Sequence, residues 1–294
     1  ISGMHLSLLG MLCFHLLQRL RMGILSASVC SVMLMLFYGM LTGESVSAMR
    51  ALGMFALAMA AKAVGRSYDL LSALALSAIF LLLDNPAYLY YSGFLLSCGC
   101  ICAVGVLLPQ MQAILSLKKL GQALLTGFAL QAATLPLVAW FYCEIPLYGI
   151  WINLLVIPTL AIVLVSGVLG AAVGIWQVSA AKIVLFPGCI LIQGYQFLCE
   201  LARKLPGAVW IVGQPKKWQI LLYYGLLAAG CLLGKTAAKK ALKSEKKETQ
   251  EKEKIPRRLV GIAVFLIFWC AGTLLMCHRF RMCMEITCLD VGQG

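Results

Sequence analysis

The chain contains few charged residues and only three histidines, and these shortages already exclude a class of protein. Of its 294 residues, 12% are Asp, Glu, Lys or Arg, against about 25% in a typical soluble domain. Hydrophobic residues make up 62%, and several apolar runs reach the roughly 20 residues that span a bilayer. The composition excludes a soluble globular domain and predicts an all-α, polytopic helical membrane protein.

Patterns that carry enzyme chemistry are also missing. The sequence has no paired intramembrane carboxylates, no Ser-His-Asp spacing, no P-loop and no Cys-x2-Cys pair. His5, His15 and His278 are too scattered for a local metal motif. Most of the 13 cysteines, such as Cys98, sit inside apolar runs, where cysteine behaves as a small hydrophobe. We therefore expect no catalytic residue, metal ligand or cofactor in this segment, and no enzyme activity of its own.

The two ends carry no recognisable targeting segment. The chain begins with Ile1, shows no signal peptide, and stops after "ITCLDVGQG". Both ends are expected to be cut from a longer polypeptide.

Charged residues mark the loops and divide the apolar sequence into ten predicted transmembrane spans, some of them interrupted. The seventh is too long for one straight crossing, and we expect it to be tilted or broken near Pro158. The predicted spans lie near 2–18, 22–41, 46–61, 70–83, 91–109, 121–141, 148–175, 180–200, 218–234 and 259–277.

The distribution of Lys and Arg predicts the orientation, because cytoplasmic loops carry the excess. Placing the Lys-rich segment 235–258 inside also puts most of the 24 Lys and Arg residues inside, with both chain ends outside. We therefore predict a membrane core over 1–234, a charged cytoplasmic linker over 235–258 and a last span over 259–277. The linker would attract anionic lipid head groups; nonspecific attraction of nucleic acid is the alternative.

The stretch from Gln131 to Pro158 combines an apolar composition with polar residues and helix breakers. Its polar side chains are Gln131, Thr134 and Asn153. Its prolines are Pro136, Pro146 and Pro158. Proline breaks or kinks a helix, so these prolines predict a discontinuous helix that lines a polar path through the bilayer. The alternative is a helical hairpin whose amides only join helices.

Arg50 is a cation inside a predicted span. A charge deep in the bilayer costs at least about 2.5–3.5 kcal/mol on insertion scales, so it usually pairs or faces a cavity. Arg50 either faces a path for an anionic substrate or extends its long side chain to the membrane surface. His5, about one turn into the first span, either titrates near the outer surface or hydrogen-bonds a neighbouring helix; we favour the second.

A turn with a strong local signal separates the fourth and fifth spans. Asp84-Asn85-Pro86 has typical turn chemistry, and Tyr88, Tyr90 and Tyr91 follow it. The tyrosines predict an interfacial aromatic belt, with base stacking at a pore mouth as the less favoured alternative.

Several segments in order resemble one family, the ComEC competence proteins, which import single-stranded DNA across the inner membrane during natural transformation. These segments are "ISGMHLSLLG", "SAMRALGMFALAMAA", "DNPAYLYYSGFLLSCGCICAVG", "QAATLPLVAWFYCEIPLYGIWINLLVIP" and "LDVGQG". The last resembles the opening strand of the family's metallo-β-lactamase-like domain, which would place that strand within 278–294. Leu95 stands where family members tend to have Gln.

The resemblance implies an inner-membrane channel for single-stranded DNA, embedded in the lipid bilayer of the plasma membrane. The DNA-path candidates it favours are Arg50, Gln131, Thr134, Asn153 and His5. It also implies a cytoplasmic DNA motor and an outer DNA receptor as partners, and it is compatible with a homo-oligomer. Metal ligands of the lactamase-like domain would lie beyond Gly294.

Two other functions remain open. The spans could anchor an extracytoplasmic metallo-β-lactamase-like hydrolase or nuclease, or they could form a small-solute transporter. No internal repeat supports the transporter.

Overall fold

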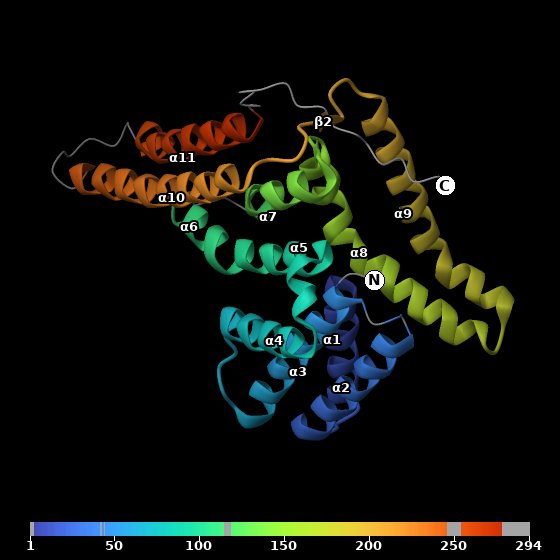
Figure 1. Ribbon diagram of the computed structural model, residues 1–294. Helices are drawn as coiled ribbons and strands as arrows, with labels where there is room; N and C mark the ends of the chain where they lie inside the picture. Colours follow the sequence, from blue (N-terminus) through green and yellow to red (C-terminus); the bar gives the residue numbers. More distant parts are fainter. Residues whose placement is uncertain (1–2, 42, 44, 115–118, 246–253, 278–294) are drawn as a thin grey trace. The chain divides into compact units, whose positions relative to one another are not determined.

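The computed structural model describes residues 3–41, 43, 45–114, 119–245 and 254–277 (Figure 1). The chain forms two units, residues 1–211 and a second unit that begins at Val212. The helices and strands of the first unit are α1 (Gly3–Arg19), α2 (Ile24–Leu41), α3 (Val46–Val64), α4 (Leu70–Asp84), the 3-10 helix η1 (Pro86–Tyr90), α5 (Ser92–Cys102), the π-helix η2 (Ala103–Leu107), α6 (Leu108–Ile114), α7 (Lys119–Tyr142), β1 (Glu144–Pro146), α8 (Gly149–Gly174), α9 (Val178–Lys204) and β2 (Val209–Ile211). The second unit contains α10 (Lys217–Glu245) and α11 (Lys254–Cys277).

A helix lies at each of the ten predicted span positions, with α5, η2 and α6 together forming the fifth. Within the described residues, six helices are long and apolar enough to cross a membrane, and two shorter apolar helices occur at Leu70–Asp84 and Ile262–Met276. The predicted all-α membrane class is confirmed in this coarser form, and the count of ten crossings stays a prediction. The long helices are Ile24–Leu41, Val46–Val64, Ser92–Gln112, Gly121–Tyr142, Trp151–Gly174 and Val178–Lys204.

The first three helices pack closely around a shared core. Their buried side chains are Leu6, Phe14, Ala27, Met35, Ala51, Leu52, Phe55 and Met59. Gly10 of α1 lies against α3, where an added Cβ would stand 2.7 Å from Phe55 Cζ. Small residues allow such close approach between membrane helices. Gly3 lies near Ser47 and Lys62 lies over Phe14, so α1 and α3 run parallel.

We expect the Gly10→Ala variant to be less stable by about 1–3 kcal/mol, because an extra methyl overpacks the contact with Phe55. Gly194→Ala is the matched control. Gly194 also lies inside a helix, but a Cβ there meets nothing within 4 Å, so the control should gain about 0.5–1 kcal/mol. Thermal unfolding of the detergent-solubilised chain measures both. A Gly10→Ala variant that melts at or above the wild-type temperature would contradict this packing.

Local capping explains where the helices of this unit begin and end. The Asn85 side chain accepts a hydrogen bond from the Ala87 amide at 3.0 Å, which confirms the turn chemistry predicted for this position. The Asp69 carboxylate caps α4 by accepting from the Ser72 amide at 2.8 Å, and its hydrogen bonds with Ser72 lower the pKa of Asp69. Gly65 ends α3 with a φ of 71°, a left-handed conformation that glycine adopts readily.

The predicted helix breaks at Pro136 and Pro158 are wrong. Helix α7 continues through Pro136 and α8 continues through Pro158. Threonine hydroxyls near both prolines donate to helix carbonyls: Thr134 to Leu130 at 2.8 Å and Thr159 to Leu155 at 2.6 Å. Neither hydroxyl bonds the carbonyl that loses its helical donor, that of Ala132 for Pro136 and that of Leu154 for Pro158. The two helices continue in spite of that loss.

The third proline of this stretch and an unpredicted π-turn mark where the helices are irregular. Pro146 lies outside the helices, in strand β1. The π-helix η2, Ala103–Leu107, lies just before Pro109. A proline ring clashes with the carbonyl four residues earlier, here that of Gly105, and the wider π-turn offers a reason for the irregularity. Such π-bulges often occur at functional sites.

Two short strands join loops that are far apart in sequence. Strand β1 pairs antiparallel with β2, with Ile145 opposite Trp210. The Tyr148 hydroxyl donates to the Pro206 carbonyl at 3.1 Å. The link between α7 and α8 and the segment Val209–Ile211 after α9 therefore lie on the same side of the first unit.

The second unit is a helical pair whose contacts are both apolar and polar. Gly272 faces Tyr223, where a Cβ would lie 2.9 Å from Cδ2. The Trp269 indole donates to the Tyr223 hydroxyl at 3.0 Å, and the Gln219 amide donates to the Leu275 carbonyl at 2.9 Å.

The predicted domain boundaries stay a prediction, and the structure adds where its compact units and helices end. The boundary between the units lies after residue 211, not after 234. Helix α10 extends to Glu245 and α11 begins at Lys254, so helices enter the predicted linker 235–258 from both ends. The strand predicted within 278–294 lies outside the described residues.

Candidate functional site

Arg50 is buried in the first unit, with only 5% of its surface exposed. It lies in the second turn of α3, whose N-terminal cap is Ser45. Because so little of the side chain is exposed, it does not extend to the membrane surface. The alternative in which Arg50 extends its side chain to the membrane surface is therefore wrong.

The hydrogen bonds of the Arg50 guanidinium are few and weak. Nη1 donates to the Met54 sulfur at 3.6 Å, and a thioether is a weak acceptor. Nε has no hydrogen-bond partner. Within the part of the chain that the structure describes, no carboxylate pairs with Arg50; Glu44 lies outside that part. Arg50 is thus a buried cation whose charge these residues do not neutralise.

Neutral groups surround this cation. A Cβ on Gly3 would lie 3.3 Å from Arg50 Nη2, so the guanidinium sits against the first turn of α1. Cys98, Cys100 and Tyr68 lie near enough to Arg50 to interact with its charge if they ionised. Burial raises the pKa of the Tyr68 phenol, so this group stays neutral near pH 7 and adds no negative charge.

Gln131 joins α7 to the segment that follows it. Its Nε2 donates to the Pro146 carbonyl at 3.4 Å, and its Oε1 would lie 3.9 Å from a Cβ on Gly149. Gln131 precedes Tyr142 by about 16 Å along the helix axis, at 1.5 Å per residue. Strand β1 must therefore run back beside α7, and Cys143, with a φ of 59°, allows the reversal.

Thr134 lies where α7 packs against α5. Its Cγ2 would lie 3.7 Å from a Cβ on Gly99, and its hydroxyl proton is used in the bond to Leu130. Thr134 therefore offers only acceptor capacity to any other group.

Asn153 differs from the other candidates because it is exposed. It lies on α8 one turn after Gly149, and its carboxamide makes no hydrogen bond with any described residue. His5 lies on α1 near Gly3, is partly buried, and has an interaction partner.

The structure arranges these candidates in two groups. Arg50 and His5 belong to the packed helices α1 and α3, whereas Gln131, Thr134 and Asn153 belong to α7 and α8. Helix α5 contacts both groups: it packs against α3 on one side, and its Gly99 faces Thr134 of α7. In the described residues no hydrogen bond joins Arg50 to Gln131, Thr134 or Asn153. A continuous polar seam through both groups stays a prediction.

Sequence reasoning missed one polar group near the π-turn. Gln110 Oε1 is buried without a hydrogen-bond partner, a few residues after η2. A glutamine next to Pro109 inside an apolar span was the signal that could have indicated it. No group of three or more metal-ligating side chains occurs among the residues that the structure describes.

Comparisons with known proteins agree on one family. A family model described as "Competence protein" matches residues 1–236. The chain is similar to the ComE operon protein 3 of Bacillus subtilis, with 31% identity over 160 residues, which is 54% of this chain and 20% of the relative. The match thus covers only a fifth of that relative's length. No solved structure matches the chain.

Proposed function

Because the chain belongs to the competence protein family and is similar to ComE operon protein 3, we propose that it forms the core of an inner-membrane channel for single-stranded DNA. The strand enters from outside during natural transformation. Its phosphates pass the Arg50 guanidinium on the way through the membrane.

The single observation that carries this proposal is the burial of Arg50 without a carboxylate partner among the described residues. A buried, unpaired charge is destabilising, and intramembrane cations mark substrate paths. Guanidinium binds phosphate oxygens through a planar fork of N–H donors. In the part of the chain that the structure describes, Nη1 donates only to a sulfur atom and Nε has no partner, so these donors remain for a phosphate.

The backbone beside α7 also supports a polar path. Strand β1 is not helical, and Gln131 holds it against the middle part of α7. We propose that this segment re-enters the membrane from the outer loop beside α7. Non-helical backbone at membrane depth is tolerated only where protein buries it or where it lines a water-filled cavity. The exposed carboxamide of Asn153, one turn into α8, would add a donor and an acceptor to this path.

The β1–β2 pair agrees with the proposed alternation of the spans. Alternating the ten predicted spans with both chain ends outside puts the two loops that contain these strands on the outer face, and their pairing requires one common side. With both chain ends outside, a following lactamase-like domain would meet incoming DNA. A cytoplasmic DNA motor and an outer DNA receptor would be the channel's partners in DNA uptake.

Entry of end-labelled DNA into the cytoplasm tests this function, in cells with and without the intact gene. We expect deletion to abolish internalised label while DNA still binds to the cell surface. Unchanged entry after deletion would contradict the channel and favour the membrane anchor of an outer hydrolase.

A further inference from the structure

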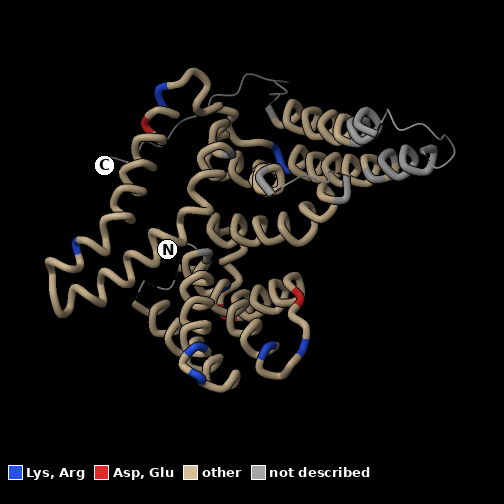
Figure 2. Tube along the Cα trace, turned by 180° about the vertical axis from the view of Figure 1, so that it is seen from behind, with Lys and Arg blue, Asp and Glu red and all other residues tan. Residues whose placement is uncertain are grey.

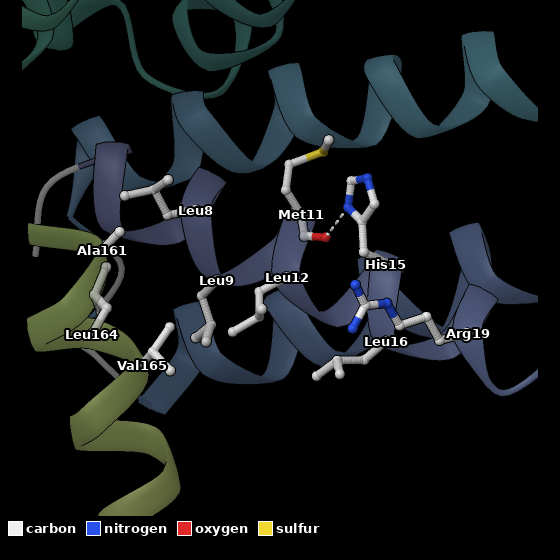
Figure 3. Close-up of a pocket in the computed structure, with 10 residues that line it drawn as sticks. All are labelled: Leu8, Leu9, Met11, Leu12, His15, Leu16, Arg19, Ala161, Leu164 and Val165. Carbon is white, nitrogen blue, oxygen red and sulfur yellow. Dashed lines mark hydrogen bonds between the residues drawn. The ribbon is translucent and has the colours of Figure 1, made fainter. Parts of the chain in front are cut away.

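An apolar groove runs between α1 and α8, away from Arg50. Its volume is about 430 Å³, within the range of small-molecule sites. Apolar side chains form nearly all of its lining, among them Leu8, Leu12, Leu16, Ala161 and Leu164 (Figure 3). Such a lining suits a hydrocarbon chain and not a phosphodiester backbone.

One end of the groove carries two polar side chains. His15 and Arg19 line it there, one and two turns beyond Leu12. Figure 3 shows the Arg19 side chain turned back along α1 toward Leu16 and His15. His15 Nδ1 is 2.7 Å from the Met11 carbonyl; since a carbonyl only accepts, Nδ1 carries the proton and Nε2 is left for another group.

Basic residues gather at this same end. The turn between α1 and α2 and the turn after α3 both carry Lys or Arg (Figure 2), and the Lys62 ammonium lies 4.5 Å from the Phe14 ring centroid. The described residues that line the groove include no carboxylate. The accumulation of Lys and Arg places this end at the cytoplasmic face, where anionic lipids concentrate.

The length of the groove matches one leaflet. From Leu8 to Arg19 helix α1 rises about 16 Å, and half of a roughly 30 Å hydrocarbon core is about 15 Å. We infer that the groove between α1 and α8 binds an anionic phospholipid of the cytoplasmic leaflet, with one acyl chain along Leu8, Leu12 and Leu16 and the phosphate on Arg19. The Nε2 atom of His15 lies beside the head group.

Native mass spectrometry of the full chain in detergent, titrated with phosphatidylglycerol or phosphatidylcholine, tests this site. We expect phosphatidylglycerol to bind more tightly, and Arg19→Gln to weaken it about fivefold. Phosphatidylcholine has the same phosphate but no net charge, so Arg19→Gln should weaken its binding by a smaller factor. Arg66→Gln is the matched control, because Arg66 is exposed near the same end but does not line the groove; its lipid affinity should equal that of the wild type. Equal affinities in wild type and Arg19→Gln would overturn the inference.

A second variant tests the acyl-chain half of the site. Ala161→Trp should fill the groove and weaken both lipids, while the melting temperature reports whether the protein still folds. Unchanged lipid binding in a folded Ala161→Trp variant would overturn the inference. The inference would also be overturned if an oligodeoxynucleotide displaced the bound lipid, because the groove would then bind DNA. It would equally be overturned if the wild type formed a dimer that Ala161→Trp disrupts, because a second copy of the chain would then fill the groove.

Discussion

Replacing Arg50 with methionine is expected to abolish DNA import while the protein still folds and inserts. Methionine keeps much of the side-chain volume and removes the charge and the donors. Hydrogen bonds to a charged group contribute about 1.5–3 kcal/mol each, so losing even one phosphate contact should lower import roughly 10- to 100-fold. Internalised labelled DNA per cell, normalised to the amount of membrane-embedded protein, measures the effect.

Thermal stability separates a path residue from a structural one at this position. An unpaired buried charge costs folding energy, so Arg50→Met should melt at or above the wild-type temperature although it does not import. Arg50→Lys keeps the charge without the planar fork and should import at an intermediate rate. If Arg50→Met imported normally, or if it lost import only together with stability, the phosphate-facing role of Arg50 would be wrong.

Replacing Asn153 with leucine is likewise expected to abolish import. Asn153 is exposed on α8 and makes no hydrogen bond in the described residues, so leucine removes no internal contact. Leucine is favourable within a membrane helix on insertion scales, so insertion should be at least as efficient as in the wild type. If import is lost while insertion is normal, the cause is therefore the missing carboxamide in the DNA path.

Ile157→Leu is the control for Asn153. Ile157 lies one turn further along the same face of α8 and is 39% exposed, and the change keeps the position apolar. Import should be unchanged in this variant. Normal import by Asn153→Leu would show that the carboxamide does not line the path.

The local features of this chain could be read from the sequence. Apolar runs bounded by charges gave a helix at every predicted span position, because a lipid environment leaves the backbone little choice but a helix. The turn at Asn85 was also predictable, since its side chain bonds to an amide only two residues away.

Features that depend on distant contacts were not predictable. Burial of Arg50 requires α1 to approach α3 closely enough for Gly3 to touch the guanidinium, and no periodicity within α3 contains that information. The β1–β2 pair is similar, because each strand has three residues and its partner is more than 60 positions away. The helix breaks predicted at the prolines were wrong because the effect of a proline on a helix depends on the residues packed around it. Pro136 is buried within a continuous helix, whereas the helix becomes irregular, with a π-turn, just before Pro109.

Photo-cross-linking of an arrested DNA strand tests the central claim most directly. A strand with photoreactive nucleotides and a bulky block at its trailing end would stop partway through the membrane, and mapping the cross-linked peptides would locate its path. We predict cross-links in α3 around Arg50 and in the first turn of α1. A strand that enters the cytoplasm and arrests, yet cross-links only elsewhere, would contradict the account.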